Sequence, residues 1–188
     1  MTLLIIGVLL WAFVHLVPTI AGPLKQSMTG QLGQNGYKGV FSLLIVAALV
    51  LIVLGWRSTP EQFLYVLPPW SRTLGLVLMI LSFLLLGAAH HPTRIKRFFR
   101  HPMLSGVFVW SVSHLLMNGT ARALVLFGGL GLWAVVEIIL INRREGLYIK
   151  PDTPALGEEL KGFFISGIIF GVVLFLHPYF AGVAAFPR

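Results

Sequence analysis

The sequence predicts an all-α fold, a polytopic transmembrane helical bundle of about six helices in one integral membrane domain, residues 1–188. Three observations predict this class. The chain is 57% hydrophobic and only 11% charged, with a mean hydropathy of +0.89, well outside the range of soluble domains. Several apolar stretches approach the ~20 residues that a helix needs to cross a bilayer core. Basic residues are concentrated in alternate loops, as in membrane proteins with a defined orientation.

Six stretches are expected to form the membrane helices. Backbone groups in lipid must be satisfied within their own segment, so each stretch is expected to be a helix rather than a strand. The first carries Trp11 and His15 and lacks a basic leader, so we expect a retained helix rather than a signal peptide. The fourth is short, and only the fifth contains an Asp, Glu, Lys or Arg residue, Glu137. In chain order the stretches run Thr2 to Ile20, Gly39 to Trp56, Thr73 to Ala89, Pro102 to Met117, Ala123 to Ile141 and Gly162 to Phe180.

The basic residues predict how the helices are oriented. Ten of the 14 Lys and Arg residues lie in the loops after the first, third and fifth stretches, and four lie on the other side. The positive-inside rule places the ten in the cytoplasm, so we expect a multi-pass protein of the bacterial inner membrane with both termini outside. The net charge of +8 then reflects topology and contact with the lipid bilayer, and no nucleic-acid motif accompanies it.

Two nine-residue segments are similar to each other. Gly7 to His15 and Gly106 to His114 share Gly, Val, Trp and His at the same offsets. They lie in the first helix of each half of the chain. Halves of three helices run in opposite directions across a membrane, so the similarity is consistent with an inverted 3+3 repeat. With a rise of about 1.5 Å per residue, both histidines are expected near the middle of the bilayer.

Each segment places Gly, Trp and His four residues apart, which puts them on one side of a helix. A small residue leaves room for a flat macrocycle, an indole packs against it, and a neutral imidazole supplies an axial metal ligand. Two such helices facing each other predict a haem site in which His15 and His114 bind the metal. The alternative is that each histidine only packs, hydrogen-bonded to a carbonyl or to a serine such as Ser111 or Ser113. The candidate residues of this site are Gly7, Trp11, His15, Gly106, Trp110 and His114.

Other ionisable residues are weaker candidates. Arg100 and His101 lie at the cytoplasmic boundary, in a basic interface for lipid headgroups or for an anionic ligand such as the haem propionates. His101 precedes His114 by about 20 Å of helix, so the two cannot share one iron. His177 is near the end of the sixth stretch and is expected to be interfacial. Glu137 is either a hydrogen-bonded or snorkelling carboxyl, or a proton carrier or cation contact.

The stretch from Arg100 to Gly119, RHPMLSGVFVWSVSHLLMNG, resembles the NnrU family of membrane proteins. Matching segments also occur at residues 37–42, YKGVFS, and 126–129, LFGG, so the resemblance extends over nearly the whole chain. The family is associated with nitrogen-oxide respiration, which implies a link to denitrification. It is related to 15-cis-zeta-carotene isomerase, a membrane enzyme that contains haem b.

The resemblance implies that His15 and His114 hold haem b, and that the protein serves redox chemistry, haem handling or isomerase-like chemistry on an apolar or small redox substrate. Ser111 stands where the isomerase has a cysteine that can replace a histidine ligand on reduction, which argues against such a ligand switch here. The RHP motif followed by Gly106 also resembles membrane methyltransferases of the isoprenylcysteine carboxyl methyltransferase type, which would use His101 at the methyl-donor site. A non-catalytic membrane module or transporter, for which Glu137 is the relevant feature, is the third alternative.

Overall fold

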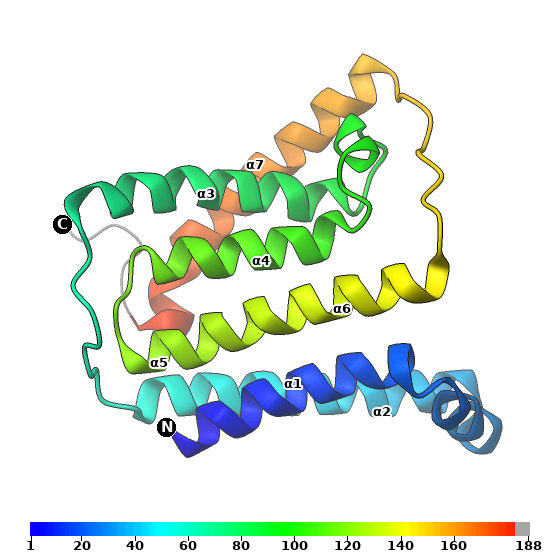
Figure 1. Ribbon diagram of the computed structural model, residues 1–188, viewed down its shortest axis with the longest axis horizontal. Helices are drawn as coiled ribbons and strands as arrows, with labels where there is room; N and C mark the ends of the chain where they lie inside the picture. Colours follow the sequence, from blue (N-terminus) through cyan, green and yellow to red (C-terminus); the bar gives the residue numbers. More distant parts are fainter. Residues whose placement is uncertain (183–188) are drawn as a thin grey trace.

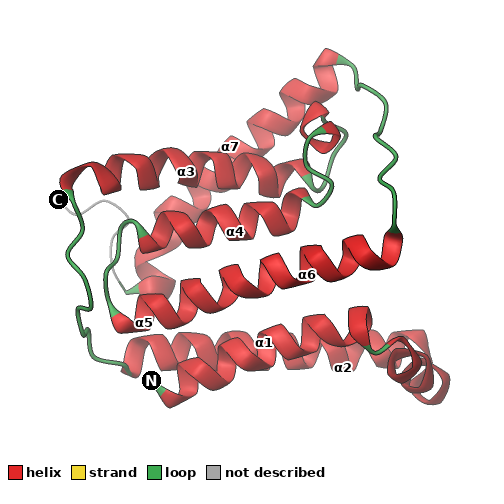
Figure 2. Ribbon diagram, viewed as in Figure 1, coloured by secondary structure: helices red, strands yellow, loops and turns green. Residues whose placement is uncertain are grey.

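The structure is a computed structural model that describes residues 1–182, and within them it consists of helices and connecting loops (Figures 1 and 2). Phe63 and Thr120 form an isolated bridge between two loops. α5, the π-helical turn η2 and α6 join into one helix, Ala121–Glu145. The elements are α1 (Thr2–Ile20), α2 (Gly22–Ser58), α3 (Pro69–Ala88), the 3₁₀ turn η1 (Arg94–Arg97), α4 (Pro102–Leu115), α5 (Ala121–Ala123), η2 (Leu124–Gly128), α6 (Gly129–Glu145) and α7 (Leu156–Ala181).

Within the described residues, five helices are long and apolar enough to cross a membrane, which confirms the predicted helical membrane bundle. They are α1, α2, α3, the joined helix Ala121–Glu145 and α7. The fourth predicted span, α4, has 14 residues. At about 1.5 Å per residue it is about 21 Å long, shorter than the ~30 Å core of a bilayer. α4 therefore packs within the bundle without spanning the core by its own length.

α2 begins at Gly22, so the expected start of the second helix at Gly39 is wrong. The segment expected as a loop is helical except at a kink at Gly33, where φ is 70° and ψ is 169°. Glycine adopts positive φ without the steric penalty of a side chain. Pro23 lies in the first turn of the helix, where its missing N–H loses no hydrogen bond. The part of α2 before the kink turns away from the long axis of the helix and lies at one end of the bundle (Figure 1).

α6 lies between α1 and α4, as Figure 1 shows. Two glycines near its start allow both neighbours to approach closely. A Cβ atom on Gly129 would lie 2.6 Å from Cγ1 of Val8 in α1, and one on Gly131 would lie 3.0 Å from Cβ of Ser111 in α4. A side chain at either position would push a neighbouring helix away. The buried core cluster lies beside this contact and is formed by residues of α1, α2, α5 and η2, with Val8 and Phe127 among them.

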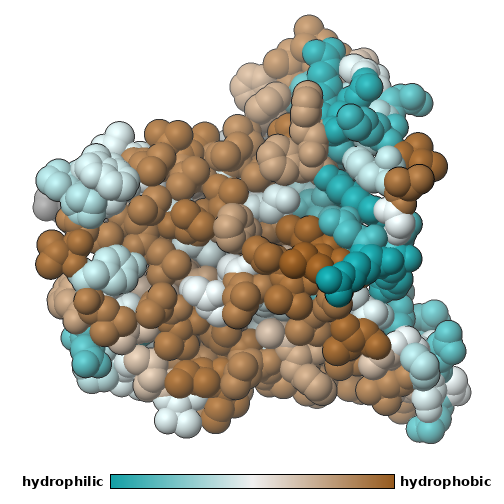
Figure 3. Space-filling view, viewed as in Figure 1, coloured by the Kyte–Doolittle hydropathy of each residue, from teal (hydrophilic) through white to brown (hydrophobic). Residues whose placement is uncertain are grey.

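Charged and apolar surfaces are segregated along the bundle. The connections around the start of α2, around η1 and between α6 and α7 all lie at one end (Figure 1), and Figure 3 shows a hydrophilic band there beside a broad hydrophobic belt. We call this the basic end; the N-terminus, the α2–α3 linker and α5 lie at the opposite end. The cytoplasmic placement of the basic end stays a prediction. Its basic residues are Lys25, Lys38, Arg94, Lys96, Arg97, Arg100, Arg143, Arg144, Lys150 and Lys161.

Candidate functional site

A cavity of about 650 Å³ lies between α2, α3, α4, η2 and α7. Its volume is within the ~300–1,000 Å³ typical of sites for small molecules and cofactors. Pro68 and Arg72 line it at the end opposite the basic end, and Met79 and Phe83 line it further along α3. The walls are mainly apolar and aromatic, with Ile52, Val53, Trp56, Leu76, Trp110, Leu126, Phe127, Phe170, Val173 and Leu174 among the lining residues.

The ring of His114, which lines the cavity, is held by one hydrogen bond and by contacts with two aromatic rings. Its Nδ1 atom lies 2.9 Å from the carbonyl oxygen of Trp110, and a carbonyl can only accept, so Nδ1 carries the proton. Its ring stacks on Phe127 with the centroids 4.2 Å apart and an angle of 20° between the planes. In the neutral ring Nε2 then keeps its lone pair, which is the tautomer that a metal-binding histidine requires. His114 therefore lines the cavity in the tautomer whose Nε2 atom is unprotonated.

His177 of α7 lines the same cavity. It is close enough to His114 to interact with it electrostatically. The sequence placed His177 at the interface as a weak ligand candidate, because it directly precedes Pro178 near the end of a predicted span. Two imidazoles from helices far apart in the sequence thus reach one cavity. No local pattern in the sequence indicates this pairing.

His15 lies elsewhere, packed between α1, α2 and α6. Its ring centroid is 4.4 Å from that of Trp11, 4.9 Å from that of Trp133 and 5.5 Å from that of Phe41. Its Nδ1 atom lies 2.9 Å from the carbonyl oxygen of Trp11, so the local geometry of His114 is repeated. His15 does not line the cavity, and α6 separates α1 from α4. The structure thus gives the two histidines different surroundings: His114 lines the cavity, and His15 is packed among Trp11, Phe41 and Trp133.

The two glycines of the similar segments serve helix packing instead of leaving room for a ligand. A Cβ atom on Gly7 would lie 2.8 Å from the backbone nitrogen of Ile52, and one on Gly106 would lie 2.9 Å from Cγ of Leu86. The carbonyl of Gly106 also accepts a hydrogen bond from Ser82 Oγ at 2.9 Å. Because 3.6 residues make one turn, eight residues rotate a helix by about 80° beyond two full turns. Gly and His of one segment therefore face different neighbours.

The serines near His114 do not bond to its ring. Ser113 Oγ donates to the carbonyl oxygen of Gly75 at 2.7 Å. Ser111 is 2% exposed and packs against Gly131, and its Oγ atom has no hydrogen-bond partner among the described residues. Both histidines bond to a backbone carbonyl, as the packing alternative expected. In each histidine that bond involves Nδ1, so it leaves Nε2 available for another contact.

Arg100 and His101 lie at the basic end and hold the start of α4 to the end of α6. Arg100 donates to Glu145 Oε2 at 3.0 Å and to the carbonyl of Gly146, and its guanidinium is 5.5 Å from the ring centroid of Tyr148. His101 Nε2 lies 3.0 Å from Asn142 Oδ1. Neither residue lines the cavity. Their contacts are with the end of α6 and the residues after it, so Arg100 and His101 do not form one site with His114.

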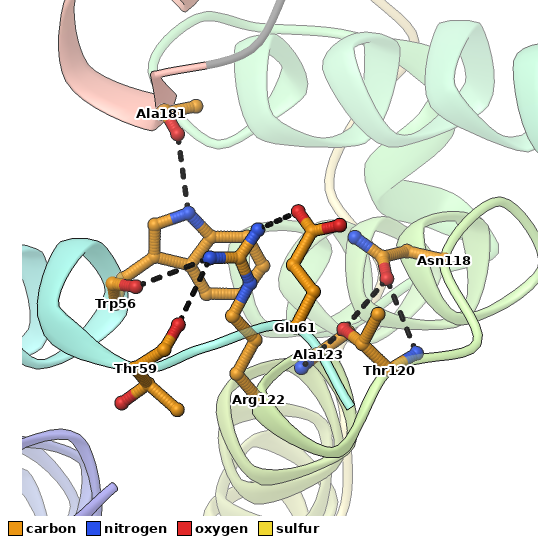
Figure 4. Close-up of polar contacts among 8 residues, drawn as sticks. All are labelled: Trp56, Thr59, Glu61, Asn118, Thr120, Arg122, Ala123 and Ala181. Atoms are coloured by element: carbon orange, nitrogen blue, oxygen red, sulfur yellow. Dashed lines mark hydrogen bonds and ion pairs between the residues drawn. The ribbon is translucent and has the colours of Figure 1, made fainter. Parts of the chain in front are cut away.

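Arg122 is a buried cation at the end opposite the basic end (Figure 4). The sequence identifies it as a basic residue and predicts no role for it in a site. It is 9% exposed, forms an ion pair with Glu61, and donates to the carbonyl oxygens of Trp56 at 3.4 Å and Thr59 at 3.2 Å. Its guanidinium lies 4.4 Å from the ring centroid of Trp56. The Trp56 indole donates to the carbonyl oxygen of Ala181 at 3.1 Å, and both residues line the cavity. Arg122 therefore holds the wall where α2 meets α7.

Two further residues set the chemistry of this end. Arg72 lines the cavity, is exposed, and has no hydrogen bond or ion pair within the described part of the chain. The hydroxyl of Tyr65 donates to the carbonyl oxygens of Leu115 at 2.8 Å and Asn118 at 3.2 Å. Burial raises the pKa of this hydroxyl, so it stays protonated as a donor. Arg72 thus places a positive charge among the mainly apolar residues that line the cavity.

The fold and the site define a polytopic helical membrane protein with a large apolar cavity and histidine side chains at its wall. Comparison with models of protein families shows which family the chain matches. The model of the family described as NnrU protein matches residues 3–185, nearly the whole chain. The chain belongs to the NnrU family. Neither the curated proteins nor the solved structures contain a match to it.

Proposed function

We propose that this protein binds haem b in the cavity with His114 as an axial ligand, and that it serves redox or isomerase-like chemistry linked to nitrogen-oxide metabolism in a bacterial inner membrane. The observation that carries the proposal is the orientation of His114. Its Nδ1–H is bound to the carbonyl of Trp110, which leaves the Nε2 lone pair for a metal at the wall of a cavity of about 650 Å³.

The available donors fit a haem better than a metal ion held by protein alone. Among residues 1–182, no three His, Asp or Glu side chains form a group that could hold a metal ion, and the chain has no cysteine. A porphyrin supplies four nitrogen ligands itself, so the protein needs to add only one or two. His114 supplies the first. His177, on the same cavity, is the candidate for the second.

The walls also fit a flat, mainly apolar group with a charged edge. Trp110 and Phe127 pack against His114 and against each other, with their ring centroids 4.9 Å apart. Arg72, which also lines the cavity, offers a cation to carboxylates such as the haem propionates. When bound, the haem iron would supply one-electron chemistry. The apolar walls would exclude water and admit an apolar or small redox substrate.

The test is a visible spectrum of the protein purified from haem-replete cells. We expect a Soret band that the His114→Ala variant loses and that the His15→Ala variant keeps, since His15 lies outside the cavity. His15→Ala is the matched control, because both histidines hydrogen-bond to the carbonyl four residues earlier at 2.9 Å. A wild-type protein without a Soret band, or a band unchanged by His114→Ala, would contradict the proposal.

The methyltransferase alternative gains no support. It requires His101 at a methyl-donor site, and both His101 and Arg100 are occupied by contacts with the end of α6 and the residues after it. The transporter alternative rests on Glu137, which lies apart from the cavity.

A further inference from the structure

A second polar cluster lies between α1 and α6, away from the cavity. α1 presents Trp11, His15 and Thr19 at four-residue intervals, and α6 presents Trp133 and Glu137 at the same interval. Residues four apart lie on one helical face. The two helices run in the same direction (Figure 1), so the two rows of side chains meet in register.

The contacts follow this register. The rings of Trp11 and Trp133 meet edge to face with centroids 5.8 Å apart. Thr19 Oγ1, two turns further along α1, donates to Oε1 of Glu137, one turn further along α6. His15 lies between the two contacts. Its ring is 4.9 Å from that of Trp133, and it interacts electrostatically with Glu137. An imidazole and a carboxyl thus share one buried cluster.

Several polar atoms of the cluster are buried without a hydrogen-bond partner among the described residues. They are Glu137 Oε2 and the Nε1 atoms of Trp11 and Trp133. Glu137 is 6% exposed and Trp133 is 7% exposed. Buried polar atoms in native proteins nearly always have a partner, which is often an ordered water. Of the three, Oε2 of Glu137 is the acceptor, so it is the atom at which a proton or another donor would bind.

The chemistry of these atoms favours a proton over a metal ion. The indole groups are donors and would repel a cation, and the acceptors that remain are one carboxyl oxygen and Nε2 of His15. A carboxyl group at membrane depth is strongly unfavourable in its ionised form unless a cation is paired with it, and protonation removes the charge. One proton meets this need, either on Glu137 or as an imidazolium on His15 beside the carboxylate. We propose that His15, Thr19 and Glu137 form an intramembrane proton-binding site, separate from the haem cavity, in which one proton is shared by Glu137 and His15.

The other titratable and charged groups near the cluster are Tyr37, Arg144 and His101, and none of them is a carboxylic acid. Glu137 is therefore the acidic group of the cluster. On α2, Tyr37 lies behind Phe41, with the two ring centroids 6.4 Å apart. On α6 itself, Arg144 donates to the carbonyl oxygen of Pro18 at 3.5 Å, one residue before Thr19. At the start of α4, His101 is bound to Asn142. On α6, Arg144 lies beyond Glu137 toward the basic end. A proton would therefore enter the cluster from the basic end.

Infrared difference spectroscopy of the full chain in lipid vesicles, titrated over pH, tests the site. A protonated carboxyl in apolar surroundings gives a carbonyl stretching band that an ionised or exposed carboxyl does not. We expect such a band in the wild-type protein and its loss in Glu137→Gln, which keeps the shape of the side chain and an acceptor for Thr19. Glu61→Gln, at the opposite end, is the matched control and is expected to keep the band. Difference spectra that are the same in Glu137→Gln and the wild type would overturn the proposal.

Two more variants keep the test decisive if Glu137→Gln does not fold. Thr19→Val removes the hydroxyl that donates to Glu137 and is expected to shift the band; an unshifted band would count against the site. His15→Gln removes the base that takes the proton, so the band is expected to persist to higher pH than in the wild type. A midpoint that does not change would show that His15 does not share the proton. None of these readouts depends on haem, so this proposal and the proposed function fail separately.

Discussion

Val8 of α1 fills the space that a side chain on Gly129 of α6 would need. A Cβ atom on Gly129 would lie 2.6 Å from Val8 Cγ1, closer than any real Cβ contact. This contact brings α1 onto one side of α6, while Gly131 allows α4 onto the other. The separation of His15 from His114 follows from it, and so do the two separate proposals made for the two histidines.

Gly129→Ala is expected to destabilise the protein. Val is branched at Cβ and cannot rotate its methyl groups away freely, so the helices must move apart, at about 1–3 kcal/mol. Gly128→Ala is the matched control, because the nearest atom to its Cβ is Leu124 Cδ1 at 3.6 Å, an ordinary contact. The free energy of unfolding in mixed micelles measures both. Equal stabilities of the two variants would show that α1 does not pack this closely on α6.

Arg122→Gln is expected to lower the free energy of unfolding by about 1–3 kcal/mol. The loss is below the ~3–5 kcal/mol of a fully buried pair, because the side chain of Glu61 is 48% exposed. Arg144→Gln is the control, since its side chain is 50% exposed and its ion pair with Glu145 is a surface pair worth about 0–1 kcal/mol. Thermal unfolding compares the two. If Arg122→Gln were as stable as Arg144→Gln, the contacts drawn in Figure 4 would not hold the wall.

His177→Ala tests the second axial position of the proposed haem. We expect the Soret band to remain, because His114 is unchanged, while the band shifts and added carbon monoxide binds faster at the vacated position. Phe170→Leu, another change in the wall of the cavity on α7, supplies no ligand and serves as the control. Haem-loaded His177→Ala protein with the spectrum and carbon monoxide kinetics of the wild type would exclude His177 as a ligand.

Gly33→Ala tests the kink in α2. Alanine at φ 70° and ψ 169° would occupy a backbone region that is essentially restricted to glycine, at a cost of about 1–3 kcal/mol. Gly30→Ala is expected to be neutral or stabilising by up to about 1 kcal/mol, because Gly30 is helical and a Cβ there meets nothing within 4 Å. Unfolding in mixed micelles again gives the comparison. A stable Gly33→Ala variant would indicate a continuous helix through this position.

Part of the candidate site could be predicted because it is local in the sequence. The pairing of Trp with His four residues later predicts ring contact, and the ring centroids of Trp110 and His114 are 4.6 Å apart. The partners from distant elements could not be predicted. His177 and Arg72 reach the cavity through the packing of α7 and α3, and neither belongs to a motif. The helical segment before Gly33 was missed because it is too polar to be a membrane span.

The sequence by itself determined the class of protein, most of the membrane helices, the gathering of positive charge at one end and the family. These depend on composition and on the length of apolar stretches, which lipid constrains directly. Only the tertiary structure decided which helices touch. In an apolar solvent, helices associate through close packing rather than through a hydrophobic stripe, so small residues select the neighbours. Gly129 and Gly131 place α6 between His15 and His114, and a similarity of two segments carries no information about the helix that lies between them.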